Sequence, residues 1–206
     1  MASRSLILAS ASPARLAILR AAGLSPAVVP SDVPEDGVDG LAPADAVRTL
    51  AERKAAAVAE RGAEAEAGAS AVVVGCDSML VLGDDVRGKP RSADEARTWW
   101  RAMRGTTGTL LTGHAVRDMA TGRRSCGVSR TAVRFGAPSD AEIDAYVASG
   151  EPLRVAGGFT IDGRGAPFVD HIDGDHGTVV GLSLPLLRRL LADVGVAITD
   201  LWDEDG

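Results

Sequence analysis

Residues 72–77 read Val72-Val73-Val74-Gly75-Cys76-Asp77, a run of β-branched side chains followed by a glycine, a cysteine and a carboxylate. An uninterrupted run of valines is typical of a central strand that is covered on both faces. We therefore expect a buried strand here, with Asp77 at its carboxyl end. Ligands of open α/β sheets bind outside the carboxyl ends of strands, so Asp77 is a candidate functional residue.

Strands and helices are expected to alternate on both sides of this run. The elements expected before it are a strand over 6–9, a helix from Ser12-Pro13 to Gly23, a strand over 26–30, a helix from about Pro43 to Arg61 and a linker at 62–68. Those expected after it are a hairpin from Met79 to Val81 around a turn at 83–85, a helix from Ser92 to Met103, paired strands over 109–116 and 129–135, a helix from Ser139 or Asp140 to Gly150, short strands in the Gly-rich stretch 157–181 and a helix from about Ser183 to Val194. Strands interleaved with helices, together with a hairpin-rich middle, predict an α/β fold with a mixed β-sheet flanked by helices.

Length and composition exclude several classes of protein. The 206 residues suffice for one large domain or two small ones, and 46% apolar with 24% charged residues excludes a disordered polymer, a collagen or a coiled coil. A net charge of −6 argues against nucleic-acid binding, which needs basic surfaces. Two cysteines without CxxC spacing indicate neither a disulfide framework nor a zinc site. No stretch has the pattern of a signal peptide or the length of a membrane span, so we expect a cytoplasmic protein without a membrane partner.

The segment Ser10-Ala11-Ser12-Pro13-Ala14-Arg15 favours an anion site at the start of a helix. It combines two hydroxyls, free helical N–H groups and an arginine. An arginine in a first turn opposes the helix dipole by about 0.3–1 kcal/mol, a cost that a bound phosphate or carboxylate reverses. The alternative interpretation is an ordinary Ser-Pro cap with a solvated arginine.

Lys54 lies on the apolar stripe of the helix expected from Pro43, because it is four residues from both Leu50 and Val58. An ammonium that points inward needs a partner. It either points into a cleft at phosphate oxygens or extends past the edge of the core to water.

Two carboxylates are candidates for metal binding or general base catalysis. Asp77 either does such work or satisfies turn amides at its strand end. Glu35 lies in the polar segment 31–37 and is a weaker candidate alone, since most acidic loop residues are simply hydrated. Together they offer Mg²⁺ two oxygens, and this ion fills its other positions with water and phosphate oxygens.

Other patterns are not taken as functional sites or are given a structural role. Gly83 to Pro90 nearly matches a P-loop, but Pro90 supplies no hydroxyl and two aspartates would repel phosphates; Lys89 alone remains a candidate phosphate contact. The neighbourhood of His171 and His176 is read as a polar turn between strands rather than a metal site, and His114 as structural. No G-x-S-x-G nucleophile motif is present.

Seven segments, in order, resemble the Maf family of nucleoside triphosphate pyrophosphatases over nearly the whole chain. They are Leu8-Ala9-Ser10-Ala11-Ser12-Pro13-Ala14-Arg15, Leu50-Ala51-Glu52-Arg53-Lys54-Ala55, Gly75-Cys76-Asp77-Ser78, Gly88-Lys89-Pro90, Thr112-Gly113-His114, Ala156-Gly157-Gly158-Phe159, and Gly174-Asp175 with Val180-Gly181-Leu182. The resemblance implies an elongated mixed sheet flanked by helices, similar to that of inosine triphosphatases. It also implies a homodimer and one Maf-like domain over 1–206, with two lobes around a nucleotide cleft as the alternative organisation.

The family activity implied is cleavage of a nucleoside triphosphate between its α- and β-phosphates, with Mg²⁺ or Mn²⁺ as cofactor. By motif, Asp77 matches the proton acceptor and metal ligand, and Glu35 matches the second acidic position. The resemblance assigns Lys54 and Lys89 to catalysis, with Ser10, Ser12 and Arg15 facing the phosphates. It assigns Ala14, Ser78 and Asp162 to positions that contact substrate.

Three departures leave the preferred base open. Ala14 stands where the family often has an arginine, Ser78 where members acting on dTTP and UTP have threonine, and Asp162 where those members have glutamine. An ionised carboxylate only accepts hydrogen bonds, so Asp162 would favour bases that present N–H donors, such as guanine derivatives or cytosine.

Two alternative functions are considered. One is a housecleaning enzyme of the inosine triphosphatase type, although its N-terminal glycine and lysine motifs are absent here. The other is a non-catalytic nucleotide-binding regulator linked to cell division. Retention of Glu35, Lys54, Asp77 and Lys89 together favours catalysis.

Overall fold

The computed structural model describes residues 4–62 and 70–202. Its strands are β1 (Leu6–Leu8), β2 (Ala27–Val28), β3 (Val72–Leu82), β4 (Asp85–Arg87), β5 (Thr107–Asp118), β6 (Arg124–Phe135) and β7 (Val169–Asp173). Its α-helices are α1 (Pro13–Ala21), α2 (Pro43–Gly62), α3 (Ala93–Met103), α4 (Asp140–Ala148), α5 (His176–Val180) and α6 (Leu184–Asp193). Short 3₁₀ turns are η2 (Pro152–Arg154), η3 (Ala156–Gly158), η4 (Ala166–Phe168) and η5 (Ile198–Leu201).

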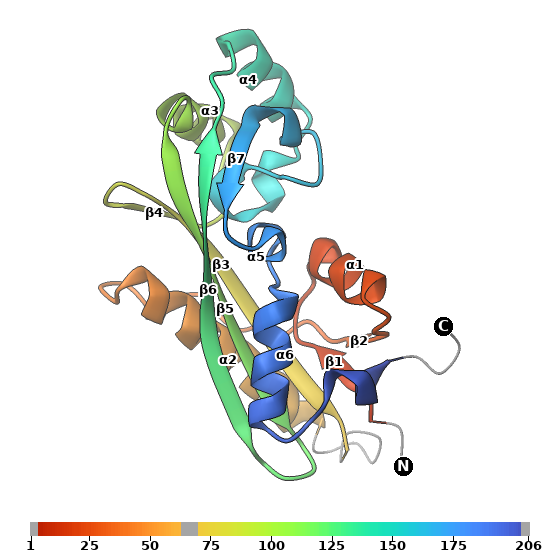
Figure 1. Cartoon of the computed structure of the whole chain (residues 1–206). Helices are drawn as coiled ribbons and strands as arrows, with labels where there is room; N and C mark the ends of the chain where they lie inside the picture. The colour runs from red at the N-terminus through yellow and green to blue at the C-terminus, as the bar shows by residue number, and fades with distance from the viewer. Residues whose placement is uncertain (1–3, 63–69, 203–206) are drawn as a thin grey trace. The chain divides into compact units, whose positions relative to one another are not determined.

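The strands form one mixed sheet in the order β2-β1-β3-β5-β6-β7, and β4 pairs with β3 off this path (Figure 1). β1 runs parallel to both β2 and β3, whereas β4 and β7 are antiparallel to their neighbours. The prediction of an α/β fold with a mixed sheet flanked by helices is therefore confirmed.

The chain divides into two compact units. Unit 1 comprises the described residues of Met1–Asp77, Thr112–Ser129 and Gly181–Gly206, and unit 2 comprises Ser78–Leu111 and Arg130–Val180. The strands β3, β5 and β6 each contribute residues to both units.

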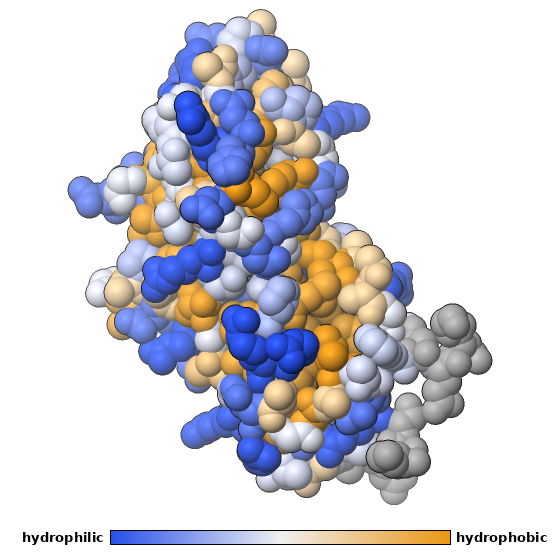
Figure 2. All heavy atoms as spheres, in the orientation of Figure 1, coloured by the Kyte–Doolittle hydropathy of each residue, from blue (hydrophilic) through white to orange (hydrophobic). Residues whose placement is uncertain are grey.

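Unit 1 has a core on each face of its part of the sheet, because successive strand residues point to opposite faces. Leu8 and Val74 pack with Leu187 and its neighbours in α6, whereas Val73 packs with Ala51 and others in α2. Figure 2 shows hydrophilic side chains over the outer side of α6. α6 is therefore amphipathic: its apolar side packs on the sheet and its polar side faces water.

Unit 2 has an aromatic core centred on Trp100 of α3. Its indole makes edge contacts with Phe135, Tyr146 and Phe168 at centroid distances of 5.9, 5.4 and 5.7 Å. The indole Nε1 donates a hydrogen bond to Gly158 O at 2.8 Å. A fully buried tryptophan thus has its one polar atom satisfied, as burial in an apolar core requires.

Several sequence predictions need correction. The run at 72–74 and the segment from Met79 form the single strand β3, so Asp77 lies within the strand and not at its carboxyl end. The hairpin expected around the turn at 83–85 is confirmed, because the far end of β3 pairs antiparallel with β4. The strand expected over 109–116 is longer at both ends, as β5 (Thr107–Asp118). The strand expected over 129–135 ends at Phe135 as predicted, but it begins earlier, at Arg124. The Gly-rich stretch holds one strand, β7, with 3₁₀ turns and the short helix α5 rather than several short strands.

The reasons are local. Asp77 and Ser78 are polar, and polar residues are less common within strands. They do not end β3, because the strand continues in pairing and packing with its neighbours on both sides of them. Gly157 and Gly158 have φ of 73° and 69°, a left-handed conformation that makes turns instead of strands. Most of the linker expected at 62–68 and the acidic end at 203–205 lie outside the described residues. Within the part of the chain that the structure describes, no helix is both long and apolar enough to cross a membrane.

Candidate active site

The start of α1 holds Ser10, Ser12 and Arg15 in one hydrogen-bonded group. Ser12 is the N-cap of α1, and its Oγ accepts the Arg15 N–H at 3.4 Å. Ser10 Oγ accepts the Ser12 N–H at 3.2 Å and a second hydrogen bond from Arg15 Nη1 at 3.1 Å. Ala14 is half-buried in the first turn between them. The segment therefore has the capped helix start that its sequence predicts.

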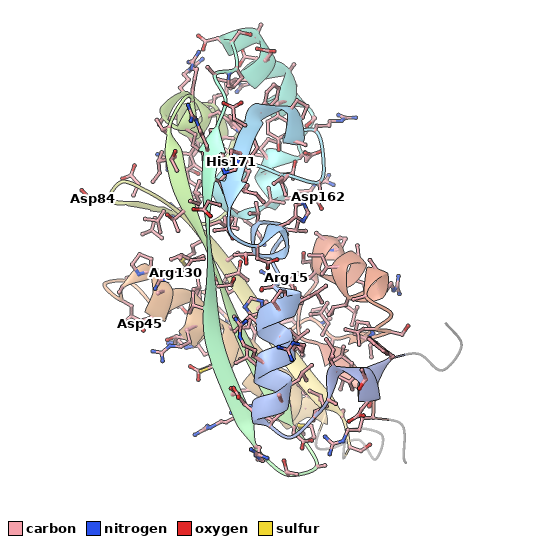
Figure 3. The ribbon with its side chains drawn as sticks, in the orientation of Figure 1. Arg15, Asp45, Asp84, Arg130, Asp162 and His171 are labelled. Carbon is pink, nitrogen blue, oxygen red and sulfur yellow. The ribbon has the colours of Figure 1, made fainter. Side chains whose placement is uncertain are left out.

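Arg15 ties α1 to two other segments of unit 1 (Figure 3). Its Nη1 donates to Cys76 O at 2.9 Å, and its Nε donates to Gly181 O at 2.8 Å. Cys76 immediately precedes Asp77, so this contact brings a fixed positive charge toward that carboxylate, whose pKa it helps to lower. The side chain is therefore not the freely solvated arginine of the alternative interpretation.

Lys54 points inward from α2, as the helical spacing predicts. The residue is 9% exposed, and its Nζ donates to Asp77 Oδ1 at 2.5 Å and to Glu35 Oε1 at 2.8 Å. Leu50 and Val58, one turn away on either side, are fully or almost fully buried. The ammonium of Lys54 thus lies between two carboxylates rather than in bulk water.

Two glycines let α2 lie close enough to the sheet for this contact. A Cβ on Gly75 of β3 would stand 2.4 Å from Ala51 O, and one on Gly113 of β5 would stand 2.2 Å from Val47 O. Atoms at these separations overlap, so any side chain here would force α2 away from the strands. The glycines therefore set the distance between Lys54 and the strand that carries Asp77.

Asp77 is 6% exposed, and burial raises its pKa above the ordinary value. Attraction to Lys54, a hydrogen bond from that ammonium and attraction to Arg15 act in the opposite direction, while the charge of Glu35 raises the pKa further. Burial is the largest of these contributions, because removing a carboxylate from water disfavours its charged form. A carboxylate with a raised pKa is a stronger base than an exposed aspartate.

Glu35 reaches this group from the segment 31–37, with its carboxylate against Lys54 of α2. Its side chain is 59% exposed, in contrast to that of Asp77. The segment is held by two arginines of α2: Arg53 donates to Asp36 O at 2.8 Å, and Arg61 donates to Pro30 O at 2.7 Å. No local pattern distinguishes these arginines: Arg53 lies beside Lys54, and Arg61 lies about two helical turns beyond it.

Three candidate residues belong to unit 2. Ser78 follows Asp77 along β3 and is half-buried, and Lys89 is exposed in the turn after β4. Gly157 N donates to the neighbouring Gly88 O at 2.8 Å, which fixes the backbone before Lys89. Asp162, labelled in Figure 3, is exposed in the loop between η3 and η4.

A hydrogen-bonded group that sequence analysis missed holds the loop of Asp162. Tyr146 OH lies 3.1 Å from Thr160 Oγ1 and accepts the Thr160 N–H at 3.1 Å. Thr160 Oγ1 also donates to Glu151 Oε1, which accepts the Gly165 N–H at 3.3 Å. Burial raises the pKa of the Tyr146 phenol, which therefore stays protonated. The group brings together residues far apart in sequence, so no local pattern reveals it.

The histidines take structural or surface positions. His114 is fully buried, its Nε2 accepts the Ser183 N–H at 2.8 Å, and its Nδ1 lies 3.0 Å from Thr112 O. The structural interpretation of His114 is therefore confirmed. His171 and His176 are exposed in β7 and at the start of α5, so the polar turn between strands expected there is wrong.

Comparison with known proteins shows the family of the chain. The family model described as Maf-like protein matches residues 5–194. The chain belongs to the Maf-like protein family. It is 59% identical over 199 residues to a nucleoside triphosphate pyrophosphatase of Streptomyces coelicolor, covering 97% of this chain and 95% of that one. Proteins of the same name from Streptomyces avermitilis and Nocardia farcinica are 55% and 52% identical, each alignment covering at least 95% of both chains.

Resemblance to the Maf-like family implies a divalent metal, and two residues of unit 1 fit one. Glu35 and Asp77 both direct a carboxylate oxygen at the same ammonium, so they already share a cation. Mg²⁺ prefers such oxygens, needs only one or two carboxylates from the protein and takes the rest from water and phosphate. Among the described residues, no group of three or more His, Cys, Asp and Glu side chains is placed to hold a metal. The donor set therefore suits an ion that also binds substrate.

Proposed function

We propose that this chain is a nucleoside triphosphate pyrophosphatase that cleaves the bond between the α- and β-phosphates. The names of relatives that align along nearly their whole length support this function. Support from the chain itself comes from one observation: the buried carboxylate of Asp77 contacts Lys54, which also contacts Glu35. A base, a fixed cation and a second carboxylate are the groups that hydrolysis of a metal-bound phosphate needs.

In this proposal Asp77 is the general base. A water oxygen attacks the α-phosphorus, the bond from that phosphorus to the bridging oxygen breaks, and pyrophosphate leaves with the electron pair. The water proton passes to Asp77, whose raised pKa makes it a stronger base than an exposed aspartate. A divalent metal held by Glu35 and Asp77 would polarise the phosphate and neutralise its charge.

Cationic groups and N–H donors bind the phosphates in this proposal. Lys54 contributes a buried ammonium, and the start of α1 contributes N–H groups with Ser10, Ser12 and Arg15 beside them. The family resemblance also assigns Lys89 to the phosphates. Because charge develops on the phosphate oxygens during cleavage, fixed positive charges lower the barrier more than they strengthen ground-state binding.

The remaining assignments concern the base and the assembly. Ala14, Ser78 and Asp162 contact the nucleotide, and the carboxylate of Asp162 favours a base with N–H donors. The active protein is a cytoplasmic homodimer. Light scattering of the purified protein tests the dimer.

The deciding experiment measures pyrophosphate release from a panel of ordinary and modified nucleoside triphosphates with Mg²⁺ or Mn²⁺. We expect release from one base class and a loss of about 10²- to 10⁴-fold in kcat for Asp77→Asn, the usual contribution of a general base. Asp45→Asn is the control, because Asp45 is an exposed aspartate of α2 that pairs with Arg48 on the same helix. Full turnover in Asp77→Asn contradicts the assigned base. Nucleotide binding without release in the wild type favours the regulator.

A further inference from the structure

A cavity of unit 1, which the proposed function does not use, lies between α2 and the β5–β6 hairpin. Its volume is about 450 Å³, within the range of small-molecule sites. The lining residues are Glu52, Arg53, Ala56, Ala115, Val116, Arg117, Arg124, Ser125 and Cys126. We call this cavity the hairpin pocket.

Strand alternation explains why cationic side chains gather there. Ala115 packs with the α2 side of the sheet, so Arg117, two residues on, points to the same face. On β6, Cys126 also packs with the α2 side, and Arg124 precedes it by two residues. Glu52 and Arg53 of α2 complete the rim of the hairpin pocket.

The hairpin pocket has an excess of positive charge in a chain whose net charge is −6. It is lined by three guanidinium groups and one carboxylate. The hydrogen bonds of Arg53 go to the backbone carbonyls of Asp36 and Gly37, which leave its charge uncompensated. Among the described residues, no carboxylate is within ion-pair distance of Arg117 or Arg124.

The remaining wall of the hairpin pocket carries one negative charge, that of Glu52. Burial raises the pKa of the Cys126 thiol, and a hydrogen bond with Glu52 raises it further, so the sulfur is uncharged at neutral pH. Ala56 and Ala115 add small apolar surfaces. The carboxylate of Glu52 accepts the hydrogen bond of the Cys126 thiol. Its single negative charge is outnumbered by the three guanidinium groups of the lining.

We propose that the hairpin pocket binds a small phosphate-bearing anion, separately from the cluster of Lys54, Asp77 and Glu35. Guanidinium groups bind phosphate through paired, charge-assisted hydrogen bonds, and they remain charged at every physiological pH. The volume accommodates pyrophosphate or a nucleotide. Arg117 and Arg124, on which the proposal rests, take no part in the proposed hydrolysis, whereas Arg53 also holds the segment that carries Glu35.

Cys126 provides a local reporter for this test. Its side chain is half-buried at the hairpin pocket, whereas Cys76, the other cysteine, is fully buried and serves as an internal reference. The rate of alkylation of Cys126 by neutral iodoacetamide is followed by mass spectrometry of its peptide. The protein is kept with EDTA, so no metal-dependent turnover occurs. Sodium phosphate, sodium pyrophosphate and a non-hydrolysable nucleoside triphosphate are compared with sodium chloride at equal ionic strength.

We expect at least one phosphate compound to slow alkylation saturably in the wild type, and the most effective one identifies the class of ligand. The double variant Arg117→Ala/Arg124→Ala should weaken this protection about tenfold or more, since two charge-assisted contacts are lost. The matched control is Arg188→Ala/Arg189→Ala, which removes two exposed arginines of α6. The single variant Arg124→Ala, at an exposed position, should weaken protection by itself.

Three results would overturn the proposal. In the first, sodium chloride protects Cys126 as well as the phosphate compounds do. In the second, protection is unchanged in Arg117→Ala/Arg124→Ala. In the third, the α6 control loses as much protection as the pocket variant. Loss of pyrophosphate release with protection intact concerns only the proposed hydrolysis, so the two proposals fail separately.

Discussion

Asp77 is subject to two opposing influences that can be separated by mutation. Burial raises its pKa, and the ammonium of Lys54 lowers it. Lys54 thereby keeps the pKa of Asp77 lower than burial alone would set it, while the carboxylate is still a stronger base than an exposed aspartate. Lys54 makes this possible only while its Nζ stays within hydrogen-bond distance of Asp77.

Replacing Lys54 by glutamine should move the acid limb of the pH profile. In the wild type, the acid limb of kcat/KM should have a pKa above about 3.9, the ordinary value for aspartate. In Lys54→Gln the limb should lie at higher pH, because burial and the charge of Glu35 are no longer opposed by the ammonium. The measurement is pyrophosphate release between acid and neutral pH. If the rate falls but the limb stays where it was, Lys54 does not tune Asp77.

Asp118, at the end of β5, should contribute stability that depends on pH. Burial raises its pKa, but hydrogen bonds from Thr121, the Ala120 N–H and Arg4, together with the charge of Arg4, outweigh it and leave the pKa lowered. A lowered folded-state pKa gives stability that is present above the unfolded value and lost as pH falls through the folded value. Asp118→Asn should therefore cost about 1–3 kcal/mol at neutral pH.

Urea unfolding at neutral and acid pH measures the effect of Asp118→Asn. The difference from wild type should shrink below about pH 3.9. Asp84→Asn, at an exposed turn, is the control and should match the wild type at both pH values. A difference that is the same at both pH values means that the carboxylate charge of Asp118 is not the source.

At the scale of elements, the closeness of α2 and β3 rests on the absence of a side chain. Gly75→Ala should destabilise the protein by about 1–3 kcal/mol, the usual cost of overpacking, because its Cβ would overlap Ala51 O. It should also reduce pyrophosphate release by displacing Lys54 from Asp77. Gly62→Ala at the end of α2 is the control, since nothing lies within 4 Å of its added Cβ. A Gly75→Ala protein with wild-type stability and turnover contradicts this account of the packing.

Helices were predictable from local signals, and strand lengths were not. Ser12, Ser92, Ser139 and Ser183 each cap the helix that their sequence predicts. Caps act within one turn, so they can be read from a few neighbouring residues. The full length of β3 depends on its pairing with β1 and β4. The residues of β3 themselves give no sign of where this pairing begins and ends.

The candidate site was predictable in part for the same reason. Lys54 and the α1 start carry local patterns, namely an apolar stripe and a Ser-Pro cap. That Lys54 contacts Asp77 and Glu35 together was not evident, because the three residues come from separate segments. The α2 arginines that hold the Glu35 segment lack any pattern that distinguishes them from solvated charges.

At the scale of the whole molecule, the two units have different cores but shared strands. Unit 1 is packed by aliphatic side chains, and unit 2 is packed around Trp100. Because β3, β5 and β6 contribute residues to both units, unfolding of one unit removes structure from strands that continue into the other. We therefore expect the chain to unfold as one cooperative body.

Leu187→Ala tests this cooperativity. Leu187 is fully buried in unit 1, and its truncation should cost about 2–5 kcal/mol. In a Trp202→Phe background, tryptophan fluorescence reports Trp99 and Trp100 of unit 2, and far-UV circular dichroism reports the helices of both units. The urea midpoints of both signals should fall together, because a defect in unit 1 weakens strands that unit 2 also uses. Leu41→Ala, which truncates an exposed leucine, should change the free energy of unfolding by no more than about 0.5 kcal/mol. Both of its urea midpoints should therefore stay close to those of the parent. A fluorescence midpoint that stays in place while the dichroism midpoint falls means that each unit unfolds independently, despite the strands they share.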